Sequence, residues 1–395
     1  MALTQGTSAG AILELVRSGQ VRTRRELQDL TGISRSTLSL RMSQLVGAGY
    51  LREAGQVAGA TGRPARILSF DEAGQLVLAV DLGATHAHLA VIDAGGQIIA
   101  EASSEIKIDA GPDEVLRNVT KRLFELLSRS NRHLSEVAGV GVGIPGPVRF
   151  STQRPNQPPL MPGWHDHPVA ERLSDSLGVP VFVDNDANLM GLGEMRERHP
   201  SSPSVLFVKV GTGIGAGVIL RGEPERGISG GAGDIGHIRM VGDEYTRQCT
   251  CGAIGCLATE ASGGAIARTL KESGTSVEST IDVARLLAAG DAHAIETVRR
   301  AGRLLGDVLA TSVALLNPEV LVLGGAITAT GDYFLHAVRD SIFARTVPLA
   351  TRELVITTSG LGSDAAVHGA RHMVIEQTFS AEAVDGRLAG GRLSL

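Results

Sequence analysis

Aromatic residues are scarce in this sequence of 395 residues, which contains 8 Phe, 3 Tyr and 1 Trp. Its core must therefore be built mainly from Ala, Val, Leu and Ile, and its 50 Gly predict many tight turns. Long apolar runs are also lacking, and none approaches the roughly 18 residues that a membrane-spanning helix needs. The N-terminal residues lack the basic segment and apolar run of a secretory signal. We therefore expect a cytoplasmic protein that does not span a membrane.

Cysteine is equally rare, and the three cysteines, Cys249, Cys251 and Cys256, lie close together in the sequence. Three cysteines cannot all pair within one chain, and a bridge across a single residue would be strained. In a cytosolic chain such a cluster favours metal binding over disulfides. Buried free thiols are the alternative.

Acidic residues are few in the first 70 positions, where four acids stand against nine Arg and give a net charge of +5. The other 325 residues carry 28 basic and 38 acidic side chains, a net charge of −10. A basic segment joined to an acidic body is typical of a nucleic-acid-binding part attached to another domain.

The basic segment has the pattern of two helices joined by a tight turn. Thr23 and Glu26 form a capping box that predicts the start of the first helix, which ends near Gly32, and Ser34 caps the second. Along the second helix, the predicted buried stripe is Leu38, Met42, Leu45 and Val46. The remaining polar face is typical of a recognition helix for double-stranded DNA, and its predicted DNA contacts are Arg35, Ser36, Thr37, Ser39 and Arg41.

Two short strands, 50–53 and 67–70, are predicted on either side of a glycine-rich loop and would form a wing. Arg63 and Arg66 are the wing residues expected to contact DNA, because the narrow minor groove attracts guanidinium groups. Residues 1–72 are thus predicted to form a winged helix-turn-helix domain. The alternative is a helical cap whose solvated arginines serve oligomer contacts.

The body repeats one pattern, an apolar strand, a glycine turn and a second strand, at 76–93 and again at 204–221. Strands that alternate with helices predict an α/β fold. Glycine turns allow backbone N–H groups to approach an anion, although these lack the features of a Rossmann fingerprint or a P-loop. Two duplicated lobes facing a common cleft would bind a nucleotide, and the candidate residues are Asp81, Gly83, Thr85, Gly211, Thr212, Gly213, Gly324 and Gly325.

Residues 77 to about 376 resemble the ROK family, whose members are repressors and sugar kinases. The segments that carry the resemblance are Asp81–Thr85, Gly143–Gly146, Pro155-Asn156 with Trp164, Asp184–Asn188, Gly211–Gly217, Gly236-His237, Cys249–Cys256 and Asn317–Gly325. The resemblance implies a two-lobed actin-like (RNase H-like) ATPase or sugar-kinase fold behind the winged helix-turn-helix. Lobe 1 would span 76–190 and be completed by a helix near 364–376, and lobe 2 would span 191–363. The polar residues 377–395 are expected to form a flexible tail.

The resemblance also implies the residues of each site. His237 would join the three cysteines in a closed, structural Cys3His zinc site. Asp186 would be the base that deprotonates a sugar hydroxyl in a kinase, although a capped turn is the plain alternative. The implied sugar ligands are Asn156, Asn185, Asp186, Asp234 and His237.

Three positions depart from the kinase pattern of the family. Asp234 stands where family kinases usually carry Glu, Ala258 replaces an expected Glu, and Ala84 replaces a glycine. Losing one charge-assisted hydrogen bond to a sugar would cost roughly 1.5–3 kcal/mol. Glu260, two residues beyond Ala258, need not point into the same pocket.

These patterns lead to three hypotheses. The first is a DNA-binding repressor of genes for sugar uptake or catabolism, a homodimer or homotetramer, in which a sugar or sugar derivative binds between the lobes and changes the spacing of the heads. The second is an active sugar kinase with a DNA-binding appendage, which alone would require ATP and Mg²⁺. The third is a regulator controlled by a protein partner.

Overall fold

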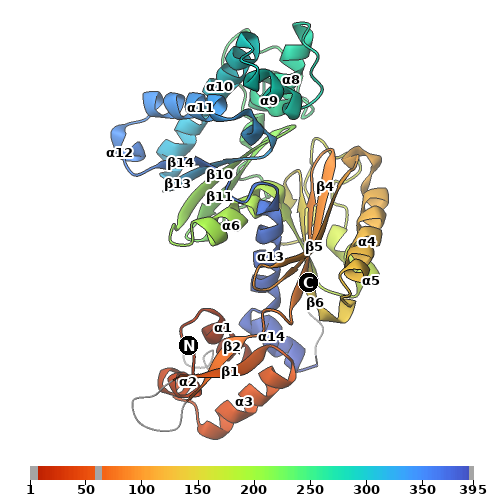
Figure 1. Cartoon of the computed structure of the whole chain (residues 1–395), viewed down its shortest axis with the longest axis vertical. Coiled ribbons are helices and arrows are strands. Elements are labelled where there is room, and N and C mark those ends of the chain that lie inside the picture. The colour runs from red at the N-terminus through yellow and green to blue at the C-terminus, as the bar shows by residue number, and fades with distance from the viewer. Residues whose placement is uncertain (1–7, 58–64, 391–395) are drawn as a thin grey trace.

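The computed structural model describes residues 8–57 and 65–390, arranged as a small head and two lobes along one long axis (Figure 1). Arg63 therefore lies outside the described residues. Within the described residues, no helix is both long and apolar enough to cross a membrane.

The head consists of three helices and a two-stranded antiparallel sheet, which include the elements predicted for a winged helix-turn-helix. Helices α1 (Ala9–Arg17), α2 (Arg24–Thr31) and α3 (Arg35–Gly47) precede the antiparallel strands β1 (Leu51–Val57) and β2 (Ala65–Phe70). The hydroxyl of Thr23 accepts the N–H of Glu26 at the start of α2, and Gly32 ends α2 in the left-handed conformation at φ 67°. The hydroxyl of Ser34 accepts the N–H of Thr37 at the start of α3. Local capping chemistry thus sets both ends of the turn.

Two features of the head differ from expectation. Helix α1 was not predicted, although Ser8 caps it and Ile12 and Leu13 are buried in its core. Val46 does not belong to the buried stripe of α3, because 44% of it is exposed while Leu38, Met42 and Leu45 are buried.

The first lobe is built on a five-stranded sheet of order β5-β4-β3-β6-β9. Its strands are β3 (Leu76–Leu82), β4 (His86–Asp93), β5 (Ile98–Glu105), β6 (Val137–Ile144) and β9 (Val181–Asn185). Helices α4 (Pro112–Arg129) and α5 (Val169–Leu177) cover one face of it (Figure 1). Between β6 and β9 lie the short strands β7 (Val148–Arg149) and β8 (Arg154–Pro155).

The second lobe repeats this design with a sheet of order β12-β11-β10-β13-β14. Its strands are β10 (Ser204–Val210), β11 (Ile214–Leu220), β12 (Glu223–Pro224), β13 (Val320–Gly324) and β14 (Val355–Thr358). Its helices are α7 (Leu257–Ala261), α8 (Gly263–Glu272), α9 (Thr280–Ala288), α10 (Ala292–Leu316), α11 (Asp332–Arg345) and α12 (Pro348–Thr351). In each sheet an antiparallel hairpin continues into two parallel strands, so the predicted duplication is confirmed.

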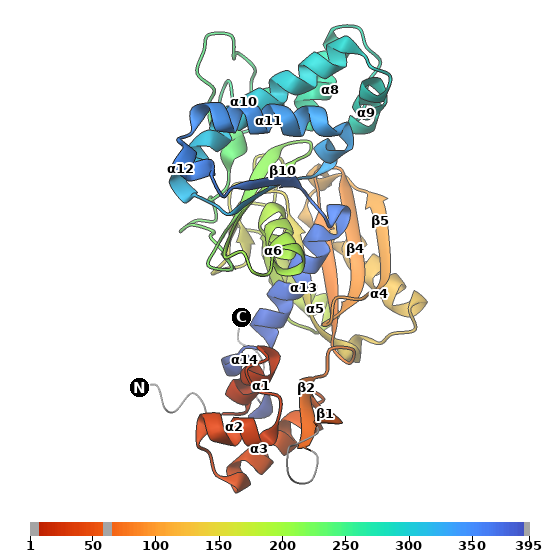
Figure 2. The same ribbon diagram turned by 60° about the vertical axis from the view of Figure 1, so that its left-hand side comes forward.

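Two helices, α6 (Asp186–Arg198) and α13 (Ala365–Thr378), lie between the two sheets and pack against each other (Figure 2). A Cβ at Gly369 would stand 1.8 Å from the backbone oxygen of Leu189, and one at Gly193 would stand 2.1 Å from that of Ala365. The two backbones therefore touch directly, which only glycine permits. The expected lobe boundary at residue 190 falls inside α6.

The expectation of a flexible tail is wrong over 381–388, which form helix α14 (Ala381–Leu388). This helix packs against α1 in the head (Figure 2). Its Asp385 carboxylate accepts the N–H of Gly10 at 2.8 Å, and a Cβ at Gly10 would stand 2.1 Å from the oxygen of Ala381. The helix is held by this tertiary contact and not by an apolar periodicity of its own, which is why composition misled the prediction.

Candidate functional site

Two buried carboxylates and one lysine meet between the lobes. Asp81 lies near the end of β3, Asp186 is the first residue of α6, and Lys209 lies near the end of β10. The Nζ of Lys209 forms an ion pair with Oδ2 of Asp186, and Oδ1 of Asp186 accepts the N–H of Ala187 at 2.7 Å. Asp186 is therefore placed at a helix N-terminus and neutralised by a lysine that the sequence analysis did not single out.

Burial controls the electrostatics of this group. It raises the pKa of Asp81, and the charge of Lys209 offsets only part of that effect. Burial alone would lower the pKa of Lys209, but the charges of Asp186 and Asp81 outweigh it and raise that pKa. Oδ1 of Asp81 has no hydrogen-bond partner among the described residues, so one buried acceptor of the cleft is available to a ligand.

The neighbouring polar side chains hold the loops of the cleft together. Asn185 caps α6 through its Oδ1 and donates its Nδ2 to the backbone oxygen of Gly146 at 3.0 Å. Asn156 donates to the oxygen of Ser229 at 3.0 Å, which links the lobe 1 loop to the loop after β12. Both amides were predicted to contact sugar, and in this structure each already has a protein partner.

Asp184, in strand β9, also binds the loop after β12. Its carboxylate, fully buried, accepts Nε of Arg226 at 2.7 Å and Nδ2 of Asn188 at 2.9 Å. The guanidinium of Arg226 also lies 3.7 Å from the centroid of the Phe150 ring. An arginine paired this way on a buried carboxylate and an aromatic face is a rigid connection between the loop and lobe 1.

The glycine loops predicted to hold a nucleotide are not alike. A Cβ at Gly211 would face open space, and one at Gly213 would only just reach Cδ1 of Leu160, at 4.0 Å. A Cβ at Gly83, by contrast, would lie 2.2 Å from Cε1 of His86, and a Cβ at Gly324 would lie 2.2 Å from Cζ of Phe207. These two glycines make room for rings of the protein itself. Of the other predicted nucleotide residues, Thr85 and Thr212 are exposed and Gly325 has φ +85°.

The predicted metal ligands converge in lobe 2, where one ligand atom each from His237, Cys249, Cys251 and Cys256 lies within 4.8 Å of the others. Sγ of Cys251 and Sγ of Cys256 are 3.6 Å apart, and Nδ1 of His237 is 3.4 Å from Sγ of Cys249. Tetrahedral zinc with Zn–S bonds of about 2.3 Å would need sulfurs about 3.8 Å apart. The donor set and its spacing therefore fit zinc.

The two acids beside this cluster behave differently. Burial raises the pKa of Asp234, whose Oδ1 lies 3.9 Å from Nε2 of His237. Glu260 is instead held by Arg247 at 3.8 Å and Arg300 at 3.6 Å. Glu260 is thus ion-paired with two arginines of the protein and does not replace the carboxylate missing at Ala258.

On the head, the N-terminal part of α3 is accessible. Arg35, Ser36 and Ser39 are exposed, whereas Thr37 and Arg41 are half-buried. Arg41 donates to Oε1 of Gln44 at 3.2 Å, and Arg66 of the wing lies 3.5 Å from a carboxylate oxygen of Glu53. The structure therefore gathers the predicted α3 residues on one helix and leaves Arg35 the freest cation among them.

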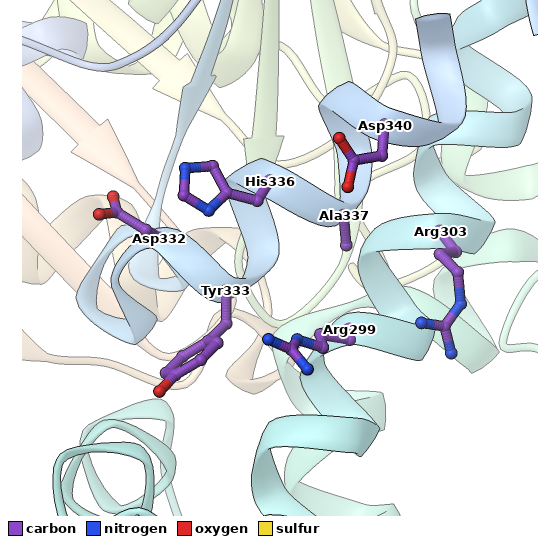
Figure 3. Close-up of a pocket in the computed structure, with 7 residues that line it drawn as sticks. All are labelled: Arg299, Arg303, Asp332, Tyr333, His336, Ala337 and Asp340. Atoms are coloured by element: carbon purple, nitrogen blue, oxygen red, sulfur yellow. The ribbon is translucent and has the colours of Figure 1, made fainter. Parts of the chain in front are cut away.

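A surface hollow between α10 and α11 is lined by none of the predicted site residues (Figure 3). Its charged lining is balanced, with Arg299 and Arg303 against Asp332 and Asp340. The guanidinium of Arg299 lies 5.3 Å from the ring centroid of Tyr333, and the figure shows the two side by side. The hollow thus offers neither a convergent charge nor the buried polar groups of the cleft.

Comparisons with known proteins agree with this geometry. The model of the ROK family matches residues 77–377. A glucokinase of Halalkalibacterium halodurans is 31% identical over 318 residues, which are 77% of this chain and 96% of that protein. A putative xylose repressor of a Caldicellulosiruptor species is 28% identical over 385 residues, which are 93% of this chain and 95% of that protein. The crystal structure of a ROK family transcriptional regulator, a homologue of the E. coli MLC protein, shares the fold over 98% of this chain and 100% of its own, with a TM-score of 0.81 and 23% identity.

Proposed function

The chain belongs to the ROK family, and on that premise we propose that it is a cytoplasmic DNA-binding transcriptional repressor of genes for sugar uptake or catabolism. One observation carries the proposal. The repressor relative matches 93% of the chain, whereas the glucokinase matches 77% although 96% of its own length is covered. The winged head accounts for the difference in coverage, and phosphorylation of a sugar does not require a DNA-binding head.

The DNA-reading surface is the N-terminal part of α3. Its exposed cation and hydroxyls can enter a major groove, while the wing arginines approach the backbone or the minor groove. A homodimer or homotetramer would present two such heads to two half-sites, so affinity depends on the spacing between heads.

The effector is a sugar or sugar derivative bound between the lobes, near Asp186 and the unpartnered oxygen of Asp81. Helix α13 provides the route to the head. It lies between the sheets, touches α6 backbone to backbone, and leads through Phe379 into α14 on the head (Figure 2). A rotation of one lobe against the other would therefore move the element on which the head is docked.

The cluster of His237 and three cysteines binds zinc in a structural role. Four protein ligands close the tetrahedron, so the metal has no open position for chemistry. Its effect is to fix the loop 237–256 beside Asp234 and thereby shape one wall of the effector site.

The DNA-binding part of the proposal is tested with operators found by genome-wide mapping, using fluorescence anisotropy at a fixed salt concentration. Arg35→Ala should weaken binding by about 5- to 150-fold, the value of one base contact. Arg129→Ala, an exposed arginine on α4, is the matched control and should bind as wild type does. If the double variant Arg35→Ala/Arg41→Ala binds the operator with wild-type affinity, α3 is not the reading helix.

A second candidate function is an ATP-dependent sugar kinase. The position of Asp186 at the start of α6 and the identity to the glucokinase favour it. Coupled ATP turnover over a panel of hexoses, pentoses and amino sugars separates the two functions. Turnover that Asp186→Asn abolishes would establish the kinase, and absence of turnover together with sugar-induced release of the operator would establish the repressor.

A further inference from the structure

The duplication of the two lobes places Asp81 and Lys209 at equivalent positions. Each is the sixth residue of a seven-residue strand, β3 or β10, that lies at the centre of its sheet. Each also pairs with a glycine on the neighbouring parallel strand, Asp81 with Gly143 and Lys209 with Gly324. The two strand ends therefore point an acid and a base into the same cleft.

The Lys209 ammonium occupies the position in the cleft that a divalent cation would otherwise fill. The Lys209 ammonium is ion-paired with Asp186 and is the strongest charge acting on buried Asp81. The side chains of Lys209 and Asp186 are only 17% and 6% exposed, so water screens the pair little. A divalent cation placed between Asp81 and Asp186 would meet this ammonium at close range and find one carboxylate already neutralised.

The nucleotide side of the cleft gives a second, independent observation. The ring of His86 lies over Gly83, and the ring of Phe207 lies over Gly324. At each of these two positions the space where a Cβ would stand is filled by a ring of the protein, so it is not open to a ligand. The residues present do not fit a magnesium nucleotide.

We propose that Lys209 is a tethered replacement for a divalent cation. Its ammonium balances the buried carboxylates of the cleft, so this body binds its effector without divalent cation or nucleotide. The inference deepens the proposed function by defining the effector as an uncharged or cationic sugar, because the two acids and one lysine leave no surplus positive charge for a phosphate. The inference depends on the residues of the cleft and not on DNA binding by the head.

The test is Mn²⁺ binding to the zinc-loaded, full-length protein, followed by the electron paramagnetic resonance of free Mn²⁺. The wild type should bind no Mn²⁺ at the cleft. Lys209→Met should gain one Mn²⁺ site per chain, because the competing ammonium is removed. Asp186→Asn or Asp81→Asn added to that variant should abolish the site. Lys121→Met, a highly exposed lysine on α4, should behave as wild type does.

Three outcomes overturn the inference. The first is a wild-type Mn²⁺ site that Asp186→Asn removes, a result that needs no lysine variant to fold. The second is a folded Lys209→Met or Lys209→Gln protein that gains no site. The third is a sugar-induced thermal shift of the wild type that disappears in EDTA and returns with Mg²⁺. Failure of operator binding would overturn the proposed function and leave these measurements unaffected.

Discussion

At the scale of single residues, the metal cluster makes the firmest prediction. Cys256 is buried, and burial together with the neighbouring thiols raises its pKa to about 12. A thiol in that environment is a poor ligand until a metal replaces its proton. Cys256→Ser should therefore reduce bound zinc from about one per chain to near zero and lower the melting temperature.

Zinc content is measured by atomic absorption after dialysis against a weak chelator. His336→Ala removes an exposed imidazole of the same lobe and should keep both the zinc and the melting temperature of the wild type. A Cys256→Ser protein that retains a full equivalent of zinc would rule out this donor set.

The metal cluster and Lys209 show what residue patterns can and cannot predict. The cysteines are close in sequence, so their spacing alone indicated a shared site, and His237 followed from the resemblance. No sequence pattern singled out Lys209, because one lysine in an apolar strand usually lies at a solvent-exposed end of the strand. Its role in the cleft depends on Asp186, which lies in the other lobe and is brought near Lys209 only by the fold.

At the scale of elements, the contact between α6 and α13 includes a pH-sensitive cluster. Glu197 of α6 receives Nη2 of Arg371 at 2.6 Å and Nε2 of His372 at 2.7 Å, both from α13. The hydrogen bond from His372, with the charge of Arg371, outweighs burial and lowers the pKa of Glu197 to about 2. Burial lowers the pKa of His372 to about 4.

Both shifts destabilise the fold in acid. In the unfolded chain His372 takes up a proton near its ordinary pKa of 6.5, but in the folded protein it does so only near 4. Its contribution to stability is therefore complete above pH 6.5 and falls as the pH drops from 6.5 towards 4, by at most about 1.4 kcal/mol per pH unit. Glu197 adds a further loss between its ordinary pKa of 4.5 and about 2.

Urea unfolding of lobe 1 between pH 7.5 and 5, followed by the fluorescence of the single, buried Trp164, measures this dependence. His372→Gln should be less stable at pH 7.5 but lose less stability on acidification than the wild type. His336→Gln should keep the wild-type slope. Equal slopes in the wild type and His372→Gln would mean that neighbouring groups, such as His368, whose pKa burial also lowers, carry the effect instead.

Elements with strong local signals were predicted well, and those made by tertiary contact were not. The strand pairs at 76–93 and 204–221 and the caps of α2 and α3 match the structure, because apolar runs, glycine turns and capping residues act locally. Helix α14 is short and polar, and α1 is only 9 residues long. Each would be marginal alone and is stabilised by packing against the other, a partnership between the two ends of the chain that no local pattern contains.

At the scale of the whole molecule, one aromatic residue joins the head to the body. Phe379, directly after α13, is fully buried, and its ring centroid lies 5.4 Å from that of Tyr50 and 4.9 Å from that of Phe70. The guanidinium of Arg17 in the head donates to the backbone oxygen of Phe379 at 2.8 Å, and that of Arg387 in α14 lies 5.2 Å from its ring centroid. A helix that runs between the lobes is thus fastened to the head through Phe379, next to the contact between α14 and α1.

This joint should be necessary for the response to sugar and not for the binding of sugar. Removing a buried Phe ring costs about 3–5 kcal/mol, and here the loss falls on the docking of the head. In Phe379→Ala, titration of the body with sugar should give the wild-type affinity, whereas the sugar-induced drop in operator affinity should shrink by tenfold or more. Phe343→Ala, which removes a 43% exposed ring from α11, should leave both quantities unchanged. If Phe379→Ala still releases the operator as the wild type does, the signal does not pass through the contact that Phe379 makes with the head.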